Sequence, residues 1–429
     1  MVPSVHAGAR WSARLTPPVI VGIFGLATYI FVYRICVRFF IRERRRDGLV
    51  IGLLVLYGLL IVLTLASYAR VVLAIQRDPG VVPLLRPRAA APAPKAEKQR
   101  QEPWYGQGWW QPQRQRQQPR QGQGDPENHP WTPPDLDPDS PGLEAFYSKD
   151  VFACEGDGRP RWCSNCALWK PDRAHHSREL GFCIRKMDHF CPWVGGMVSE
   201  TSFNFFAQFV FYTTCYCCYY LSITAYCLNQ QVQAESESVS GWIVAGLILS
   251  AFFTLFAFGM TLTAGRYILT NTTNIDLLRK RQTFTLAVRI PRDCQVPPSV
   301  RTITYPIRRT EPVAPSPSGD GSAAAAPLPS GDAAETRDLQ ASHKFAILRA
   351  EPSENPWHLG WWANWKSVMG TNVLEWLLPL RHSPCCNHES MVSDYPFGPL
   401  LDDLKRRYNV PELDKKQSPA SQSSSTGDR

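Results

Sequence analysis

The four residues Asp188-His189-Phe190-Cys191 combine the side-chain types that a cysteine nucleophile requires. A free cysteine is mostly thiol at neutral pH and reacts as the thiolate, so a catalytic cysteine needs a neighbouring base. His189 is a candidate base for Cys191, and Asp188 can orient the imidazole and stabilise its charged form. In isolation these residues favour a hydrogen-bonded turn, so their surroundings must decide between the two interpretations.

A set of metal-binding residues precedes this tetrapeptide. Cys163 and Cys166 have the two-residue spacing that lets two thiolates bind one zinc ion from a tight turn, and His175, His176 and Cys183 follow. Three cysteines and one histidine make a closed site in which zinc shapes the chain and leaves no position for a reacting water. Spacing alone leaves open which histidine binds. A thioredoxin-type redox motif is disfavoured because no βαβ pattern surrounds the two cysteines.

Four long apolar segments contain no Asp, Glu, Lys or Arg. They are residues 15–33, 48–69, 201–234 and 238–265. Each is long enough for a helix that crosses a hydrocarbon core of about 30 Å. One such run would fit a buried helix of a soluble protein, but four in one chain predict a multi-pass membrane protein.

The charges of the connecting loops indicate an orientation. The connection after the third segment carries Glu235 and Glu237 and no Lys or Arg, which places it outside the cytoplasm. The cysteine-rich segment and both termini then face the cytosol. The basic run 42–46 opposes this orientation, because a four-span arrangement puts it on the lumenal side.

The residues around the tetrapeptide resemble the cysteine-rich domain of the DHHC-type protein S-acyltransferases, or palmitoyltransferases. The resemblance rests on Cys163-x2-Cys166, on the sequence KPDRAHH at 170–176, on Cys183 and on KMDHFCPW at 186–193. Three flanking motifs agree. Residues 78–80 resemble the DPG motif of the family, residues 273–276 resemble its TTxE motif with Asn274 and Asp276 as departures, and residues 355–370 resemble its C-terminal block.

The apolar segments and the resemblance together predict an all-α membrane protein with four transmembrane helices and a cytosolic zinc-binding domain between the second and third. The resemblance implies a protein S-palmitoyltransferase that moves a long-chain acyl group from acyl-CoA to protein cysteines through an S-acyl Cys191 intermediate. His189 would be the base, oriented by Asp188. The expected partners are fatty acyl-CoA, proteins with membrane-proximal cysteines and the lipid bilayer. The zinc ligands implied are Cys163, Cys166, His176 and Cys183.

Four departures from the family concern a second zinc ion. Family members usually hold two ions, and the positions of the second ligand set read Ser177, Leu180, Phe190 and Met197. We therefore expect one structural zinc ion, with Leu180, Phe190 and Met197 in mutual contact and shielded from water in place of the second. Phe190 replaces a metal ligand and not the base. A departure of this kind is associated with fungal members of the family.

These expectations divide the chain into cytosolic, membrane and lumenal parts. The cytosolic parts are 1–14, the DPG motif and Pro/Gln-rich linker 70–150, the cysteine-rich domain 151–200, and the C-terminal region 266–429 with a disordered segment at 311–338. The membrane spans are 15–33, 48–69, 201–228 and 240–265, and the lumenal loops are 34–47 and 229–239. The stretch 84–140 is expected to be disordered as well.

Two other classes of function remain open. A catalytically inactive membrane scaffold that uses the zinc module as a binding surface would tolerate Phe190, but it would not require Asp188, His189 and Cys191 together. A transporter is disfavoured because the spans carry no ionisable pairs. The net charge of +9 is dispersed and forms no nucleic-acid recognition motif.

Overall fold

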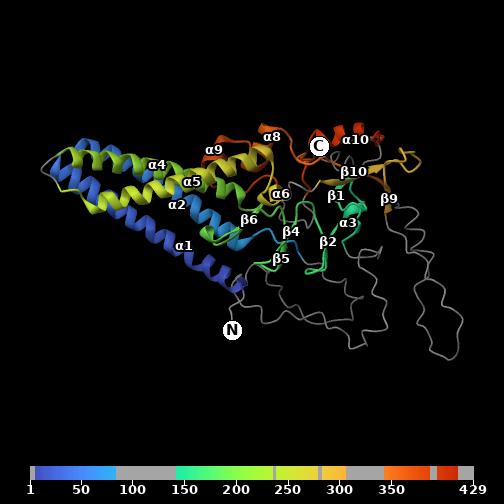
Figure 1. The fold of residues 1–429 in the computed structure, drawn as a ribbon, viewed down its shortest axis with the longest axis horizontal. Coiled ribbons are helices and arrows are strands. Elements are labelled where there is room, and N and C mark those ends of the chain that lie inside the picture. Colours follow the sequence, from blue (N-terminus) through green and yellow to red (C-terminus); the bar gives the residue numbers. More distant parts are fainter. Residues whose placement is uncertain are drawn as a thin grey trace, which may run out of the picture.

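The computed structural model describes residues 5–83, 142–234, 238–278, 283–305, 343–386 and 394–413. Figure 1 shows a bundle of long helices joined at one end to a part that is rich in β-structure. The linkers predicted at 84–140 and 311–338, and the loop residues Glu235 and Glu237, lie outside the described residues.

The long helices form the bundle. They are α1 (Val5–Tyr29), which continues as the π-helix η1 (Ile30–Glu43), α2 (Asp47–Arg77), α4 (Phe203–Gln233) and α5 (Gly241–Thr270). Three segments in the described part of the chain are long and apolar enough to cross a membrane, namely Trp11–Glu43, Asp47–Arg77 and Gly241–Thr270.

Helix α4 is as long as the others but is not among these three segments. Its Tyr, Thr, Asn and Gln side chains lower its hydropathy, and several of them pair inside the bundle. The hydroxyl of Tyr216 lies 3.1 Å from that of Tyr57 on α2, and the hydroxyl of Thr214 lies 2.9 Å from that of Thr261 on α5. Polar groups that are paired within a bundle can be buried at low cost.

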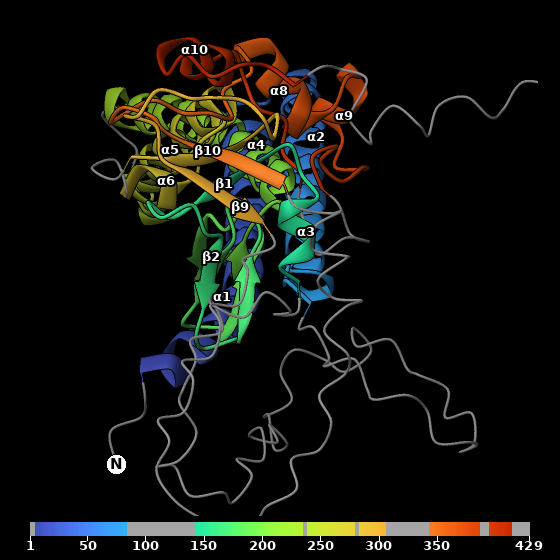
Figure 2. The same cartoon turned by 90° about the vertical axis from the view of Figure 1, so that its right-hand side faces the viewer.

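The prediction of an all-α protein is wrong, because the part outside the bundle contains a four-stranded sheet. Its antiparallel order is β1-β8-β10-β9, and Figure 2 views this part with the bundle behind it. The strands are β1 (Val151–Cys154), β8 (Thr285–Ile290), β9 (Thr302–Tyr305) and β10 (His343–Arg349). Short strands from distant segments carry too little local periodicity to be paired from the sequence.

Three small hairpins connect α2 to α4. They are β2 (Arg161–Cys163) with β3 (Leu168–Lys170), β4 (His175–Ser177) with β5 (Phe182–Ile184), and β6 (His189–Cys191) with β7 (Gly196–Val198). A short 3-10 turn, η4 (Pro192–Val194), lies at the tip of the last hairpin. The remaining short helices are α3 (Glu144–Tyr147), α6 (Asn274–Leu278), α8 (Trp361–Met369), α9 (Val373–Leu377) and α10 (Leu400–Arg407).

Candidate active site and metal centre

In the β6–β7 hairpin, the proposed nucleophile and base lie on one face of the strand, and the residue between them lies on the other face. Side chains alternate along a strand, so His189 and Cys191 share one face of the hairpin and Phe190 points to the other. Phe190 lies directly opposite Met197 on β7. The phenylalanine that replaces the second histidine of the family motif therefore lies on the face away from the base.

Asp188 holds the imidazole of His189 at a distance of 2.5 Å between Oδ2 and Nδ1. Asp188 is buried, and His189 is partly exposed. Because Nδ1 is engaged by the carboxylate, Nε2 is the nitrogen left for proton transfer. This atom is buried, and Cys191 is the second side chain that interacts with the imidazole. The arrangement matches an aspartate that orients a catalytic histidine.

The surroundings of His189 favour its charged form. Burial alone would lower the pKa of the imidazole, but the hydrogen bond with Asp188 and the interaction with Cys191 outweigh burial and raise the pKa of His189 to about 10. At neutral pH the side chain is then an imidazolium. An imidazolium beside a cysteine stabilises the thiolate, which is the reactive form of the nucleophile.

A second contact fixes Asp188 from the end of α5. The main-chain N–H of Asn274, the first residue of α6, donates to Asp188 Oδ1 at 2.9 Å. Asn274 belongs to the segment that resembles the TTxE motif. The family resemblance predicted that this segment matters, but no feature of the sequence indicated that a backbone amide would bind Asp188.

The same segment forms a buried ion pair with the cysteine-rich domain. Arg173 donates to Asp276 Oδ2 at 2.7 Å, and both side chains are almost fully buried. Arg173 also donates to the side-chain and main-chain oxygens of Asn271, each at 2.9 Å. Burial alone would raise the pKa of Asp276, but Arg173 outweighs burial and holds that pKa below its ordinary value. The departure from Glu to Asp at this motif position keeps the carboxylate.

The C-terminal block caps the end of α5. The amide of Asn355 donates to the carbonyls of Thr270 and Asn271 at 2.9 and 3.1 Å, and the amide of Asn364 donates to the carbonyl of Leu269 at 2.7 Å. The last carbonyls of a helix have no partner within the helix. These two asparagines supply the missing donors and so fix the position of the following Asn274.

The DPG segment joins the end of α2 to the β4–β5 and β6–β7 hairpins. The carbonyl of Gly80 accepts from Arg185 N at 2.8 Å, and the carbonyl of Pro79 accepts from the Ser199 hydroxyl at 2.9 Å. Gly80 has φ +80°, and a Cβ at this position would lie 2.9 Å from the Ser199 oxygen. Both the backbone conformation and the space require glycine here.

Cys191 lies at the boundary between the hairpins and the helix bundle. Its side chain is buried in the apolar cluster that also contains Phe206 and Phe209 of α4. Close to it, a cavity of about 850 Å³, including its open side, extends between α1, α4 and α5. Trp193, two residues after Cys191, lines this cavity together with Phe24, Phe209 and Ala257.

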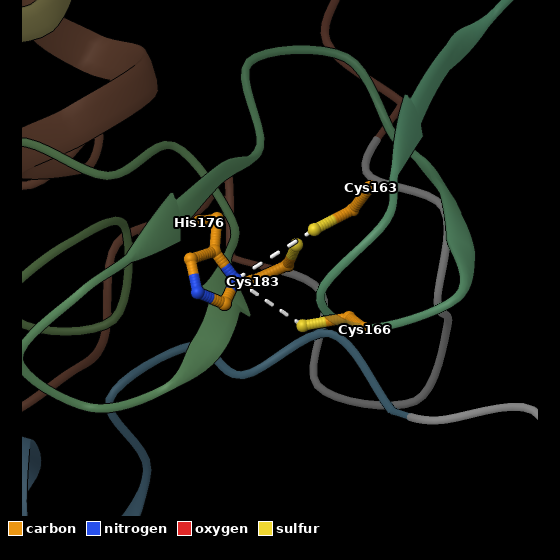
Figure 3. A group of neighbouring side chains, drawn as sticks. All are labelled: Cys163, Cys166, His176 and Cys183. Atoms are coloured by element: carbon orange, nitrogen blue, oxygen red, sulfur yellow. Dashed lines mark hydrogen bonds between the residues drawn. The ribbon is translucent and has the colours of Figure 1, made fainter.

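The four predicted zinc ligands lie together, as Figure 3 shows. Cys163 ends β2 and Cys166 lies in the turn that follows, while His176 and Cys183 are directly opposite each other on β4 and β5. Their ligand atoms all lie within 4.8 Å of one another, and His176 Nδ1 is 3.3 Å from Cys166 Sγ. The structure therefore selects His176, and not His175, for this cluster.

The chemistry of these side chains fits a zinc ion. The hydrogen bond from Cys183 lowers the pKa of Cys166 to about 5, and the same contact raises the pKa of Cys183. Three sulfurs this close cannot all be thiolates without a cation between them. Zn²⁺ takes three Cys and one His in tetrahedral structural sites and would supply that charge. Among the described residues, this is the one group of three or more potential ligands that lie together.

The four positions at which the chain departs from the second ligand set of the family lie in two different hairpins. The Ser177 hydroxyl donates to Glu179 Oε2 at 2.8 Å and accepts from Leu180 N at 3.2 Å, so it organises the β4–β5 turn. Phe190 and Met197 form a cross-strand pair in which Met197 is fully buried. Leu180 lies half-buried in the other hairpin. A shared cluster of Leu180 with the Phe190–Met197 pair stays a prediction.

The fold and this site define a membrane protein with a histidine-paired cysteine beside a Cys₃His cluster. Residues 157–281 match the family described as DHHC palmitoyltransferase. The palmitoyltransferase pfa5 of Aspergillus fumigatus is 37% identical over 92% of this chain and 89% of its own length, and that of Emericella nidulans is 34% identical over 94% and 87%. Palmitoyltransferase PFA3 of Saccharomyces cerevisiae is 29% identical over 56% of this chain and 58% of its own length.

The chain therefore belongs to the DHHC palmitoyltransferase family. The resemblance drawn from its motifs, including the association with fungal members, is confirmed. Its apolar helices and its family make it a multi-pass integral membrane protein.

Proposed function

We propose that Cys191 of this protein S-palmitoyltransferase carries the acyl group between acyl-CoA and a protein thiol. The observation that carries the proposal is the placement of His189 between Asp188 and Cys191, with the raised imidazole pKa that results. Family membership supports the activity, and it supports neither an inactive scaffold nor a transporter.

The first thioester exchange starts from a Cys191 thiolate paired with the His189 imidazolium. The thiolate attacks the carbonyl carbon of the acyl-CoA thioester, a new carbon–sulfur bond forms, and the bond to the CoA sulfur breaks. Acylation removes the charge of Cys191, which is one of the interactions that raise the His189 pKa. His189 can then release its proton to the departing CoA thiolate.

The second exchange transfers the acyl group from Cys191 to a substrate protein. The neutral His189 takes the proton of the substrate thiol, and the resulting thiolate attacks the acyl carbon on Cys191. Cys191 leaves as a thiolate and pairs again with the imidazolium. Asp188 stabilises that imidazolium throughout, because its carboxylate stays hydrogen-bonded to Nδ1.

The cavity beside Cys191 is the proposed site of the acyl chain. Its lining is almost wholly apolar, as a site for a hydrocarbon chain requires. Each methylene kept out of water there contributes about 0.8 kcal/mol. The cavity lies within the helix bundle, so the chain would stay at bilayer depth.

We further propose four membrane spans, with α4 as the third. Helices α2 and α5 both pack against α4, which supports a single four-helix bundle with α4 inside the membrane. The cysteine-rich domain and both termini would face the cytosol. The basic run 42–46 opposes this orientation. One of its arginines, Arg44, donates to the Gln230 carbonyl at 3.5 Å and is therefore hydrogen-bonded within the bundle. The predicted span boundaries are part of this proposal.

We expect Zn²⁺ at Cys163, Cys166, His176 and Cys183, with one ion per chain. The metal would hold the β2–β3 and β4–β5 hairpins together and would take no part in the acyl transfer. The order of the chain places the β6–β7 hairpin directly after this cluster, so the metal would fix the base of the catalytic hairpin.

The test is self-acylation of the purified full-length protein with palmitoyl-CoA. We expect a hydroxylamine-labile adduct on Cys191 that disappears in Cys191→Ser, because a hydroxyl is a far weaker nucleophile in this setting. Cys227→Ser, which changes a buried cysteine of α4 outside the cavity lining, is the matched control and should keep the adduct. An adduct of equal yield in Cys191→Ser would show that another residue is the nucleophile.

A further inference from the structure

Helices α8 and α9 expose a group of large apolar side chains. The members of this α8–α9 surface are Trp361, Trp362, Val373, Leu374, Leu377 and Leu380, each at least 48% exposed. Contiguous apolar surface of this kind marks contact with another apolar phase or partner. The proposed acyl transfer does not use these residues.

The opposite side of this segment packs against the helix bundle. Val368 and Met369 of α8 are buried against Ile268 of α5, and Trp365 and Trp376 pack onto the same cluster. Figure 1 shows α8 and α9 beside α4 and α5, at the end of the bundle that adjoins the β-rich part. The exposed side chains therefore continue the outer surface of a bundle that crosses the membrane.

Backbone N–H groups around the amino end of α9 form hydrogen bonds within the same segment. The Asn372 side chain accepts from Leu374 N at 3.0 Å. The Glu375 carboxylate accepts from Thr371 N at 3.2 Å and from Asn372 N at 3.4 Å, which completes a capping box. Gly370 gives the room for this carboxylate, since a Cβ there would overlap it.

Side chains of α4 donate hydrogen bonds to the backbone carbonyls at the carboxyl end of α9. The amide of Gln208 donates to the carbonyls of Glu375, Trp376 and Leu378 at 2.8, 3.1 and 3.3 Å. The Tyr212 hydroxyl donates to the carbonyl of Leu377 at 2.5 Å. In water these carbonyls would need no protein partner, whereas in lipid every backbone group must be satisfied internally.

We propose that the α8–α9 surface is immersed in the bilayer, at the boundary between headgroups and acyl chains, and that its partner is the phospholipid surface itself. Tyr212 lies about 14 Å along α4 from its first residue at the helical rise of 1.5 Å per residue, so α9 reaches well below the start of that helix. Tryptophans favour this boundary, and the exposed Arg381 can extend to the headgroups.

The test uses the full-length protein in phosphatidylcholine nanodiscs with a fluorescent amino acid incorporated at position 374. Comparison positions are 255, which is exposed in the middle of α5, and 406, which is exposed on the polar helix α10. We expect lipids spin-labelled near the headgroup to quench the probe at 374, deep-labelled lipids to quench it at 255, and aqueous iodide to quench it at 406. Iodide quenching at 374 as strong as at 406 would overturn the proposal.

A pair of glutamine variants tests the hydrogen-bonding part of the inference. Gln208→Leu removes the donor from the α9 carbonyls, so the probe at 374 should move toward water and its iodide quenching should rise several-fold. Gln233→Leu makes the same change at the other end of α4, where the side chain bonds to Asn229 within the described part of the chain, and should leave the probe as in the parent protein. Equal quenching in the Gln208 variant and the parent would refute the role given to Gln208. Neither readout depends on acyl transfer, so both hold whether or not the proposed activity is found.

Discussion

The main-chain N–H of Asn274 donates a hydrogen bond of 2.9 Å to the carboxylate of Asp188. Asp188 precedes α4 and Asn274 follows α5, so both long helices separate the two residues in the chain. The end of α5 thereby orients the carboxylate that in turn orients His189. Because Asn355 and Asn364 cap the same helix end, the C-terminal block supports the position of His189 through Asn274 and Asp188.

Asp188→Asn should change the pH dependence of self-acylation. An amide cannot stabilise the imidazolium, so the pKa of His189 should fall from about 10 toward its ordinary value of 6.5. At about pH 7 the variant then lacks the imidazolium–thiolate pair and should react roughly 10²-fold more slowly. The difference should shrink as the pH approaches 10, where the parent protein also loses its imidazolium. A loss of the same size across this range would contradict the role given to Asp188.

The same substitution should flatten the pH dependence of thermal stability. Since the folded pKa of His189 lies above its ordinary value, the folded state retains this proton between about pH 6.5 and 10. The stabilisation is therefore fully present below pH 6.5 and is lost as the pH rises through about 10. We expect the parent protein, but not Asp188→Asn, to lose this part of its stability over that interval. Melting temperatures that vary with pH equally in both proteins would exclude the effect.

Breaking the buried ion pair between Arg173 and Asp276 should strongly destabilise the domain. Asp276→Asn leaves a buried guanidinium without its counter-ion, which costs about 3–5 kcal/mol. Asp276→Glu restores the carboxylate found in the family motif and should recover most of that loss.

The control for this effect is the exposed pair of Arg406 and Asp403 on α10. Asp403→Asn should change the free energy of unfolding by less than about 1 kcal/mol, because water screens the pair. Thermal unfolding of all three variants in detergent gives the comparison. A similar small change in Asp276→Asn would show that the buried pair contributes little.

The parts of the site that could be predicted from the sequence are those encoded within a few residues. The Cys163–Cys166 spacing, the proximity of Asp188, His189 and Cys191, and the length of the apolar segments depend on local geometry alone. The choice of His176 required the family resemblance, because either histidine of the pair satisfies the spacing.

The parts that could not be predicted depend on contacts between distant segments. Nothing local in β1 or β10 indicates that both pair with β8, and this missing information led to the wrong all-α class. The bond from Asn274 uses a backbone amide, which every residue type except proline carries, so the identity of the residue gives no signal. Pairing of this kind is set by tertiary packing.

Metal analysis should find close to one zinc ion per chain. Cys163→Ala should lose the ion and fail to yield a stable protein, because binding of a structural zinc ion contributes on the order of 10 kcal/mol to folding. Cys154→Ala removes a cysteine that is equally buried in β1 but lies outside the cluster, and it should retain the metal. Phe190→His should add no second ion, since Leu180 and Met197 offer no companion ligands. A stoichiometry near two in the parent protein would contradict the single site.

Filling the cavity beside Cys191 should shift the preference among acyl chains. Ala257 is buried on α5 and lines the cavity, so Ala257→Phe should displace part of a bound chain. At about 0.8 kcal/mol per methylene, loss of space for two methylenes lowers the preference for palmitoyl- over decanoyl-CoA roughly tenfold. Leu255→Phe adds a ring on the exposed face of the same helix and should leave the preference unchanged. Competition between the two donors in self-acylation measures the ratio directly. If Ala257→Phe slows both donors equally, the cavity does not hold the acyl chain.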